Sequence, residues 1–179
     1  MRAMFLEFGV GHAAQWNGPD RYVRVDRRTL PSVDVVCDLE EGLPFRDGIA
    51  AGVFSSHCFE HLSFAGAETC VRETFRVLRP GSGICFYLPD FGWCARAYLF
   101  GEEDKREGLS EHVRDSVMGQ QRHPWDFHRS IWDAKTLSGL LERCGFVGVS
   151  VGQGRQPDEL EARAQKPELV PFSCEDVDA

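Results

Sequence analysis

Two glycines and an acidic residue near the start of the chain have the types and spacing needed to hold a nucleoside. The apolar run at residues 5–8 leads directly into Gly9 and Gly11, and the next apolar run ends at Asp26. Glycines at a turn let the backbone approach an anionic group, and a carboxylate at the tip of the following strand can accept both ribose hydroxyls. Glu7, inside the first run, suits a ligand that carries positive charge, such as a sulfonium or ammonium group. These residues predict a nucleoside site.

The spacing of this region also decides between cofactors. Residues 9–14 fit the dinucleotide-binding pattern with alanine in the last place. That pattern requires a helix whose N-terminus binds the pyrophosphate, but only residues 15–21 remain before the second predicted strand, and Gly18 and Pro19 interrupt them. A nicotinamide cofactor is therefore disfavoured. The plain structural alternative is an ordinary strand, turn and strand of an α/β core.

A second chemical pattern occupies residues 57–61, where His57 and His61 flank Glu60. The spacing matches H-x-x-E-H, the pattern of one class of zinc peptidases. Such a site needs a helix that presents both imidazoles on one face and a third ligand from elsewhere, whereas this segment directly follows a predicted strand. We therefore expect a turn that faces the ligand and holds no metal ion, with His57 as its best functional candidate. The alternatives are that Glu60 and His61 only cap and pack the turn, or that all three residues serve a zinc hydrolase.

A further histidine, His128, directly follows an aromatic-rich segment at residues 91–127. Loops at strand ends carry specificity on a fixed scaffold, so we interpret this segment as an inserted cap over the ligand. An imidazole titrates near working pH and could accept the proton of an acceptor hydroxyl, with Asp126 or Asp90 fixing its tautomer. The predicted catalytic residues are therefore His57, His128 and Asp90. A surface histidine is the plain alternative for His128.

The elements that would position these residues alternate between strands and helices. Strands are predicted at residues 5–8, 22–26, 33–37, 50–55, 84–88, 146–151 and 160–164, and helices at 65–78, stopped by Pro80 and Gly81, and at 134–144. This order predicts a mostly parallel sheet with ligands outside the carboxyl ends of its strands. Asp26, Asp38, residues 55–57 and Asp90 all follow such ends, which favours one shared cleft. The alternating polarity of 160–164 indicates an antiparallel edge strand.

Composition limits the class of protein. A chain of 179 residues suits one domain, here residues 1–166 with the inserted cap, followed by an acidic, flexible tail at 167–179. With 28 acidic against 20 basic residues the net charge is −8, which gives no electrostatic surface for nucleic acid. Seven scattered cysteines fit a reducing compartment, and no apolar run approaches the ~20 residues of a membrane span. We therefore expect a soluble, cytoplasmic protein.

Taken in order, these motifs resemble those of class I S-adenosylmethionine-dependent methyltransferases. The similar segments are 6–11 for the first motif, 25–26 for the ribose-binding strand end, 37–39 for the position that reads adenine, 54–62 for the strand and turn that face the sulfonium, and 73–83 for the helix and turn before the fifth strand. The likeness is strongest to short methyltransferases that lack a helix after the first motif, a group associated with polysaccharide or cell-envelope biosynthesis. It covers roughly residues 5–166.

The resemblance implies a Rossmann-like α/β fold of three layers, helices on both sides of a mostly parallel sheet, and S-adenosylmethionine as the cofactor. Gly9 and Gly11 would offer backbone donors to the methionine carboxylate, Asp26 would bind the ribose, and Asp38 with the Leu39 N–H would hold the adenine. Glu7 and Ser55 complete the implied cofactor site.

The implied reaction is methyl transfer to a small-molecule or saccharide hydroxyl, in which alignment of cofactor and acceptor supplies much of the catalysis. The missing first helix leaves the methionine end less covered, so binding is expected to depend on the cap or on a partner chain, such as a second copy in a homo-oligomer. The alternative from another class is a catalytically silent, methyltransferase-like binding domain.

Overall fold

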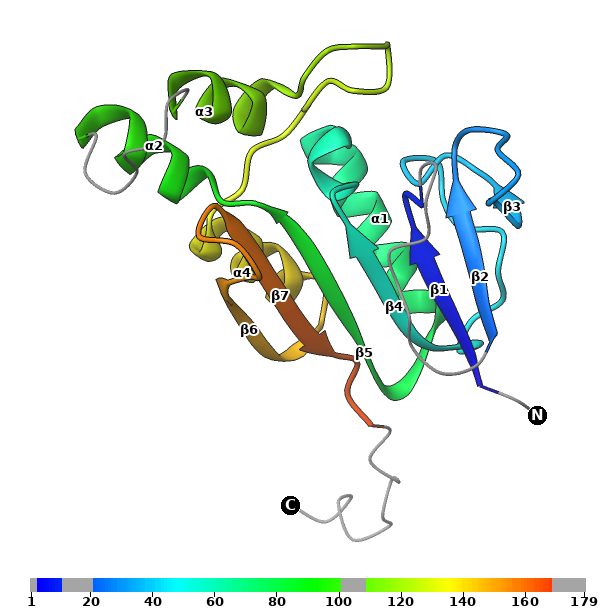
Figure 1. Cartoon of the computed structure of the whole chain (residues 1–179). Coiled ribbons are helices and arrows are strands. Elements are labelled where there is room, and N and C mark those ends of the chain that lie inside the picture. The colour runs from blue at the N-terminus through cyan, green and yellow to red at the C-terminus, as the bar shows by residue number, and fades with distance from the viewer. Residues whose placement is uncertain (1–2, 11–20, 101–108, 169–179) are drawn as a thin grey trace, which may run out of the picture.

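One twisted sheet of seven strands organises the chain in the order β3-β2-β1-β4-β5-β7-β6. The strands are β1 (Met4–Phe8), β2 (Arg21–Asp26), β3 (Val35–Val36), β4 (Ala50–Ser56), β5 (Leu78–Pro89), β6 (Val147–Gln153) and β7 (Glu159–Gln165). This computed structural model describes residues 3–10, 21–100 and 109–168 (Figure 1). The first five strands pair in parallel, and β7 runs antiparallel to both β5 and β6. The predicted mostly parallel sheet with an antiparallel strand near the C-terminus is confirmed.

The predicted edge position of residues 160–164 is wrong, because β7 lies between β5 and β6 and the edge strand is β6. The alternating polarity has another cause. Leu160, Ala162 and Ala164 are buried in the core, whereas Glu161 is half-buried and Arg163 is exposed on the opposite face. Alternation in this strand therefore reports burial on one side only, which an interior strand also shows.

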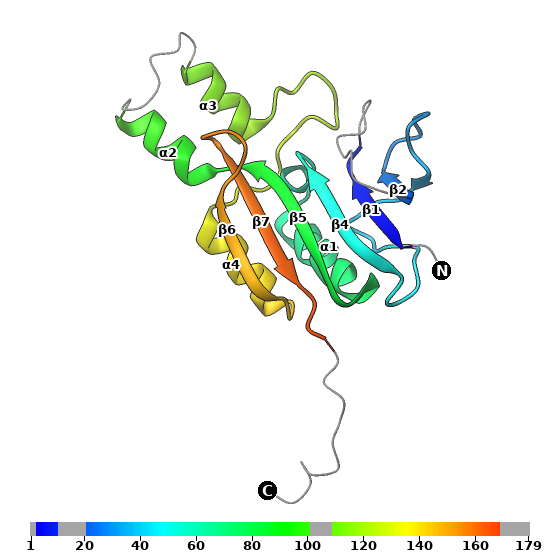
Figure 2. The same ribbon diagram turned by 60° about the horizontal axis from the view of Figure 1, so that its bottom comes forward.

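The helices are α1 (Phe64–Val77), α2 (Phe91–Phe100), α3 (Leu109–Met118) and α4 (Ala134–Arg143), with a short 3₁₀ helix, η1, at Phe59–His61. Figures 1 and 2 show α1 and α4 on one face of the sheet, which gives two of the three predicted layers within the described residues. The segment predicted as an irregular cap contains α2 and α3, which extend beyond the carboxyl ends of the parallel strands. None of the helices in these parts of the chain is both long and apolar enough to cross a membrane.

Local signals in the sequence explain where the two packed helices begin. The Ser63 hydroxyl accepts a hydrogen bond from the Gly66 N–H at the start of α1. At the start of α4 the Asp133 carboxylate accepts from the Thr136 N–H, and the Thr136 side chain accepts in return from the Asp133 N–H. Such caps satisfy N–H groups that have no partner within the helix.

The junction between α1 and β5 departs from the prediction. The helix ends at Val77 and the strand begins at Leu78, so Pro80 and Gly81 lie inside β5 rather than stopping a helix. The Lys166 ammonium donates to the carbonyls of Phe75 and Leu78, while Gly81 has a φ of +76°. These contacts hold the irregular first part of β5 in place. Local signals in the sequence do not predict this part of the strand.

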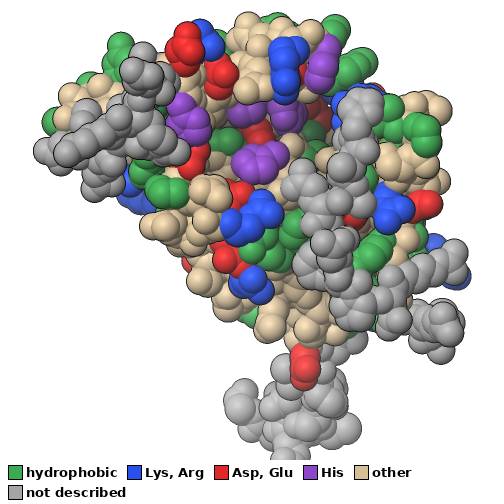
Figure 3. All heavy atoms as spheres, in the orientation of Figure 1, with side chains coloured by type: hydrophobic (Ala, Val, Ile, Leu, Met, Phe, Trp, Pro, Cys, Tyr) green, Lys and Arg blue, Asp and Glu red, His purple; other side chains and the backbone are tan. Residues whose placement is uncertain are grey.

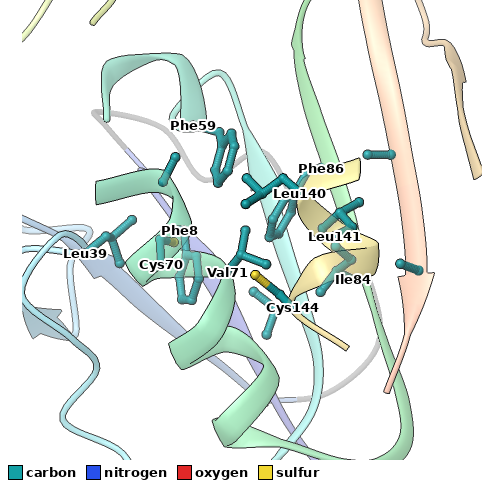
Figure 4. Packing of buried hydrophobic residues seen from close by; sticks show 14 of the residues in the cluster. Phe8, Leu39, Phe59, Cys70, Val71, Ile84, Phe86, Leu140, Leu141 and Cys144 are labelled. Carbon is teal, nitrogen blue, oxygen red and sulfur yellow. The ribbon is translucent and has the colours of Figure 1, made fainter. Parts of the chain in front are cut away.

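The hydrophobic core lies between the sheet and the two packed helices, as Figure 4 shows. Phe8 and Phe86 from the sheet, Val71 from α1 and Leu141 from α4 are all almost completely buried. Burial of a side chain of this size stabilises the fold by about 1.5–3 kcal/mol. This packing holds the carboxyl ends of the parallel strands at fixed positions. Residues 11–20, where no helix was expected, and 169–179 of the predicted tail lie outside the described residues.

Candidate functional site

A pocket of about 480 Å³ opens at the carboxyl ends of β1 and β2 and the turn that follows β4. The residues of the predicted site that line it are Gly9, Asp26, Asp38, Leu39 and His57. The segment 122–129, far away in the sequence, contributes Arg122, His123, Pro124, Trp125, Asp126, Phe127 and Arg129 to the lining. The pocket thus has one wall of strand ends and another from the end of the predicted cap.

Gly9 makes a close approach between two segments possible. Its φ is +68°, and a Cβ atom added there would lie 2.3 Å from Cys58 Cβ and 2.4 Å from Cys58 Sγ. No side chain fits at that separation, so the turn after β1 requires glycine on both steric and conformational grounds. The Gly9 N–H donates to the Val25 carbonyl at 2.9 Å. Gly9 therefore provides space at the pocket rather than the backbone donor that the sequence suggested.

Asp26 lies at the tip of β2 and is only 4% exposed. Its Oδ1 accepts from the Arg28 N–H at 2.9 Å and from Arg28 Nε at 3.0 Å, and its Oδ2 accepts from Arg28 Nη2 at 3.0 Å. An ionised carboxylate has about four lone-pair positions. Arg28 thus holds the orientation of the Asp26 carboxylate, which lines the pocket.

Asp38 connects the strand ends to the opposite wall. Its Oδ1 accepts from the Glu40 N–H at 3.0 Å, and its Oδ2 lies 3.1 Å from Arg27 Nη2. The Arg27 guanidinium in turn lies over the Trp125 ring, 4.4 Å from its centroid. The indole lines the pocket and is 47% exposed.

Hydrogen bonds hold the second wall against the turn after β4. The Arg129 guanidinium pairs with the Glu40 carboxylate at 2.5 Å, and the Arg129 N–H donates to the Glu60 carbonyl at 2.8 Å. His61 Nδ1 lies 3.0 Å from the carbonyl oxygen of Phe127. The wall is thus fixed by backbone groups as well as by side chains.

The turn itself presents His57 to the pocket. His57 has a φ of +51°, and its N–H donates to the Tyr87 carbonyl on the neighbouring strand. Its Nδ1 lies 3.3 Å from Glu60 Oε1 and its Nε2 lies 3.1 Å from Glu159 Oε1. Contact with Glu60, reinforced by Glu159, raises the pKa of His57 and favours an imidazolium. His57 precedes η1 instead of sharing a helix face with His61, so the turn lacks the geometry that the peptidase pattern needs.

Behind this turn lie a buried carboxylate, Glu60, and a half-buried imidazole, His128. Burial raises the pKa of the Glu60 carboxyl, but the contact with His57 and the charges nearby outweigh burial and leave that pKa below its ordinary value. His128 Nε2 lies 4.0 Å from Glu60 Oε1, and His128 Nδ1 lies 2.9 Å from the Ser116 carbonyl oxygen. Burial lowers the pKa of His128 in spite of Glu60, so the neutral imidazole is favoured.

The comparisons with known proteins agree with this architecture. Residues 8–86 match the family described as "Methyltransferase domain". The structure is similar to a S-adenosylmethionine-dependent methyltransferase from Thermotoga maritima, with a TM-score of 0.64 and 15% identity over 93% of this chain and 83% of the other. The fold is that of a class I methyltransferase. The fold that the sequence resemblance implies is thereby confirmed.

Other solved methyltransferases share this fold at low identity. Phosphoethanolamine N-methyltransferase 2 of Haemonchus contortus, in complex with S-adenosyl-L-methionine, has a TM-score of 0.59 and 14% identity over 93% of this chain and 49% of that one. The methyltransferase domain of citrinin polyketide synthase has a TM-score of 0.61 and 14% identity over 93% of this chain and 47% of that one. The chain spans about half the length of these two proteins. No curated protein sequence matches it significantly.

Within this methyltransferase fold, four predicted site residues lie away from the pocket lining. Glu7 and Ser55 are each only 2% exposed, and Glu7 Oε2 lies 3.9 Å from Arg24 Nε. Asp90 accepts from the Gly92 N–H at 2.8 Å and so caps the start of α2. His128 lies behind His61, with ring centroids 4.8 Å apart. Gly11 lies outside the described residues.

Sequence reasoning missed several residues of the site. The additional groups are Arg27, Arg28, Glu40, Arg129 and Glu159. Arg27 and Arg28 could have been found, because they directly follow the acidic strand end and one of them must lie near its carboxylate. Glu159 and Arg129 gave no local signal, since their contacts form only when distant segments meet.

Proposed function

We propose that this chain binds S-adenosylmethionine in the pocket at the ends of β1 and β2 and transfers its methyl group to a small-molecule hydroxyl, with saccharides as the favoured acceptor class. One observation carries the proposal: Gly9, which tolerates no side chain, and the carboxylates of Asp26 and Asp38 line the same pocket. A glycine turn beside acidic strand ends is the arrangement that accommodates a nucleoside in this type of sheet.

Each wall of the pocket has a role in this proposal. Asp26 accepts the ribose hydroxyls, while Asp38 and the Leu39 N–H hold the edge of the adenine. The Trp125 indole covers the base from the opposite wall, because it is held next to Asp38 through Arg27. The segment 122–129 then forms the acceptor side, and its fixed position aligns acceptor and sulfonium for in-line displacement.

Few side chains need to react. His57 lies on the pocket wall with both ring nitrogens against carboxylates, those of Glu60 and Glu159, so it shapes the acceptor side of the pocket rather than acting as a base. His128 and Asp90 do not line the pocket, and they act as positioning residues: His128 supports His61 and Glu60, and Asp90 fixes the start of α2. Most of the rate enhancement would come from alignment.

Calorimetric titration with S-adenosylmethionine tests the proposal. Asp26→Ala should weaken binding by about 1.5 kcal/mol or more, roughly tenfold, because a charge-assisted hydrogen bond to ribose is lost. The matched control is Asp34→Ala, an exposed carboxylate that accepts from the Arg24 N–H and does not line the pocket. Tight binding of NAD instead, or equal affinities in the two variants, would contradict the assignment.

A domain that holds the cofactor without turnover is the second candidate. The observation in its favour is that both oxygens of Asp26 already accept from Arg28, which competes with ribose hydroxyls for the carboxylate. Mass spectrometry of the purified protein distinguishes the two functions. Retained S-adenosylhomocysteine, the demethylated product, would indicate turnover, whereas retained S-adenosylmethionine alone would favour the silent domain.

A further inference from the structure

Three metal-binding side chains converge where the turn after β4 meets the second wall of the pocket. The ligand atoms of Glu60, His61 and His128 all lie within 4.8 Å of one another. The two imidazole rings meet at an interplanar angle of 84°. Figure 3 shows several histidine side chains near one another on the upper half of the visible face, with acidic side chains among them.

Backbone contacts fix both imidazoles in the tautomer that a metal ion requires. His61 Nδ1 lies 3.0 Å from the Phe127 carbonyl oxygen, and His128 Nδ1 lies 2.9 Å from the Ser116 carbonyl oxygen. A carbonyl oxygen can only accept a hydrogen bond, so each Nδ1 carries a proton and donates it. Each Nε2 of the neutral ring then has a free lone pair. Metal-binding histidines are typically oriented by a hydrogen bond of this kind from the other ring nitrogen.

Glu60 supplies the negative charge. Its side chain is only 3% exposed, and neither carboxylate oxygen has a hydrogen-bond partner among the described residues. The nearest cationic group is the His57 imidazole, whose Nδ1 makes an ion pair with Glu60 Oε1 at 3.3 Å. A buried carboxylate without hydrogen bonds is strongly unfavourable unless a cation compensates it. Among the described residues, the ion pairs of Glu60 with His57 and His128 both involve Oε1 rather than Oε2.

We propose that Glu60, His61 and His128 bind a divalent transition-metal ion, with zinc as the favoured ion. Two imidazole nitrogens and one carboxylate oxygen form a ligand set that suits zinc and its first-row neighbours. Bonds of about 2.0–2.2 Å place such ligand atoms roughly 3.4 Å apart, so the three side chains must close by on the order of 1 Å around the ion. The proposal departs from the expectation of a metal-free turn because His128, which is distant in sequence, replaces His57 as the second imidazole.

The site would face the pocket, because His61 is one of the residues that line it. An ion with three protein ligands keeps at least one position open to water or substrate. If the proposed methyl transfer holds, an acceptor hydroxyl bound at that position would have its pKa lowered and its oxygen oriented toward the sulfonium. This use of the ion rests on the proposed function, whereas metal binding itself does not.

Zinc content measures the site directly. The full chain, purified without a histidine tag and dialysed after exposure to zinc chloride, should retain about one zinc per molecule. Glu60→Gln and His61→Asn should each lose most of it. His61 is half-buried on the pocket wall, so His61→Asn keeps the test valid even if Glu60→Gln fails to fold. The matched control is His112→Asn, whose imidazole is 42% exposed and bonds Asp158 outside the cluster.

Cobalt substitution identifies the ligands, because cysteines also bind zinc. Cobalt(II) bound by imidazole and carboxylate should give visible d–d bands without the intense near-ultraviolet charge-transfer band of thiolate ligands. A thiolate band, zinc retained by His61→Asn at the wild-type level, or far less than one zinc in the wild type would each overturn the proposal. Titration of the zinc-free protein with S-adenosylmethionine, run in parallel, reports on the proposed function alone, so the two can fail separately.

Discussion

Replacement of Gly9 by alanine should disturb both the fold and the cofactor pocket. Alanine in the left-handed region costs roughly 1–2 kcal/mol. The new Cβ would also lie 2.3 Å from Cys58 Cβ, and relief of such an overlap in a packed region costs typically 1–3 kcal/mol. We therefore expect Gly9→Ala to lower the free energy of unfolding by roughly 2–5 kcal/mol, a large fraction of the 5–15 kcal/mol typical of a small domain.

The chain offers a control that separates these two costs. Gly48 has a φ of +62°, but nothing lies within 4 Å of a Cβ added there. Gly48→Ala should therefore pay only the conformational cost of roughly 1–2 kcal/mol. Urea denaturation of the two variants measures the difference, and calorimetry should show that only Gly9→Ala weakens S-adenosylmethionine binding, since Gly9 and Cys58 both line the pocket.

A second substitution tests the assigned cause. Cys58→Gly removes the two atoms that overlap, leaving Cys58 Cα at an ordinary 3.5 Å from the added Cβ. The double variant Gly9→Ala with Cys58→Gly should thus be more stable than the sum of the single effects predicts. Equal stability losses in Gly9→Ala and Gly48→Ala, or strict additivity in the double variant, would refute the steric reasoning.

Three further outcomes follow from contacts in the structure. Asp133→Ala removes the carboxylate that accepts from the Thr136 N–H at 2.7 Å, and urea denaturation should show a loss of about 1 kcal/mol; an unchanged midpoint would contradict the capping role. The hydrogen bond from Arg76 lowers the pKa of Glu73 in the folded protein. The ionised Glu73 carboxylate therefore stabilises the fold fully above its pKa in the unfolded chain, about 4.3, and this stabilisation is lost as the pH falls through the pKa of the folded state. The difference in Tm between wild type and Glu73→Gln should therefore shrink from about pH 7 to about pH 3, and a constant difference would disprove this. Trp125→Ala should weaken S-adenosylmethionine binding by roughly 1 kcal/mol or more, about fivefold. The unfolding midpoint should not move, because the indole is 47% exposed. Undiminished affinity in calorimetry would show that Trp125 does not contact the adenine.

The sequence predicts the fold well where local patterns and chain order carry the information. The strand ending at Phe8, the strand ending at Asp26 and the helix after Ser63 all lie within a residue or two of their predicted positions. The interior position of β7 was not predictable, since alternation reports which side of a strand is buried and not how many neighbours it has. The entry of Pro80 into β5 depends on the distant Lys166, which no local window contains.

In the site, too, the contacts that follow from strand order are predictable, and those made by distant segments are not. Gly9, Asp26 and Asp38 could be predicted to meet because the carboxyl ends of parallel strands share one edge of the sheet. The positions of Trp125 and His128 depend on the path of a long connection, which is fixed by the Arg129–Glu40 pair and by backbone bonds to the Glu60 carbonyl. No periodicity in the sequence records those contacts.

The one-sided burial of β7 also has a consequence for how this chain can change over evolutionary time. Ala162 and Ala164 are almost fully enclosed, and any larger side chain there must displace the core, whereas Arg163 and Gln165 are exposed. In a library of single substitutions selected for folding, the number of tolerated substitutions should alternate along β7, low at the buried positions and high at the exposed ones. Neutral drift would then accumulate on one face of the sheet and leave the other nearly unchanged, so that close homologues could differ in surface charge while they keep the same core.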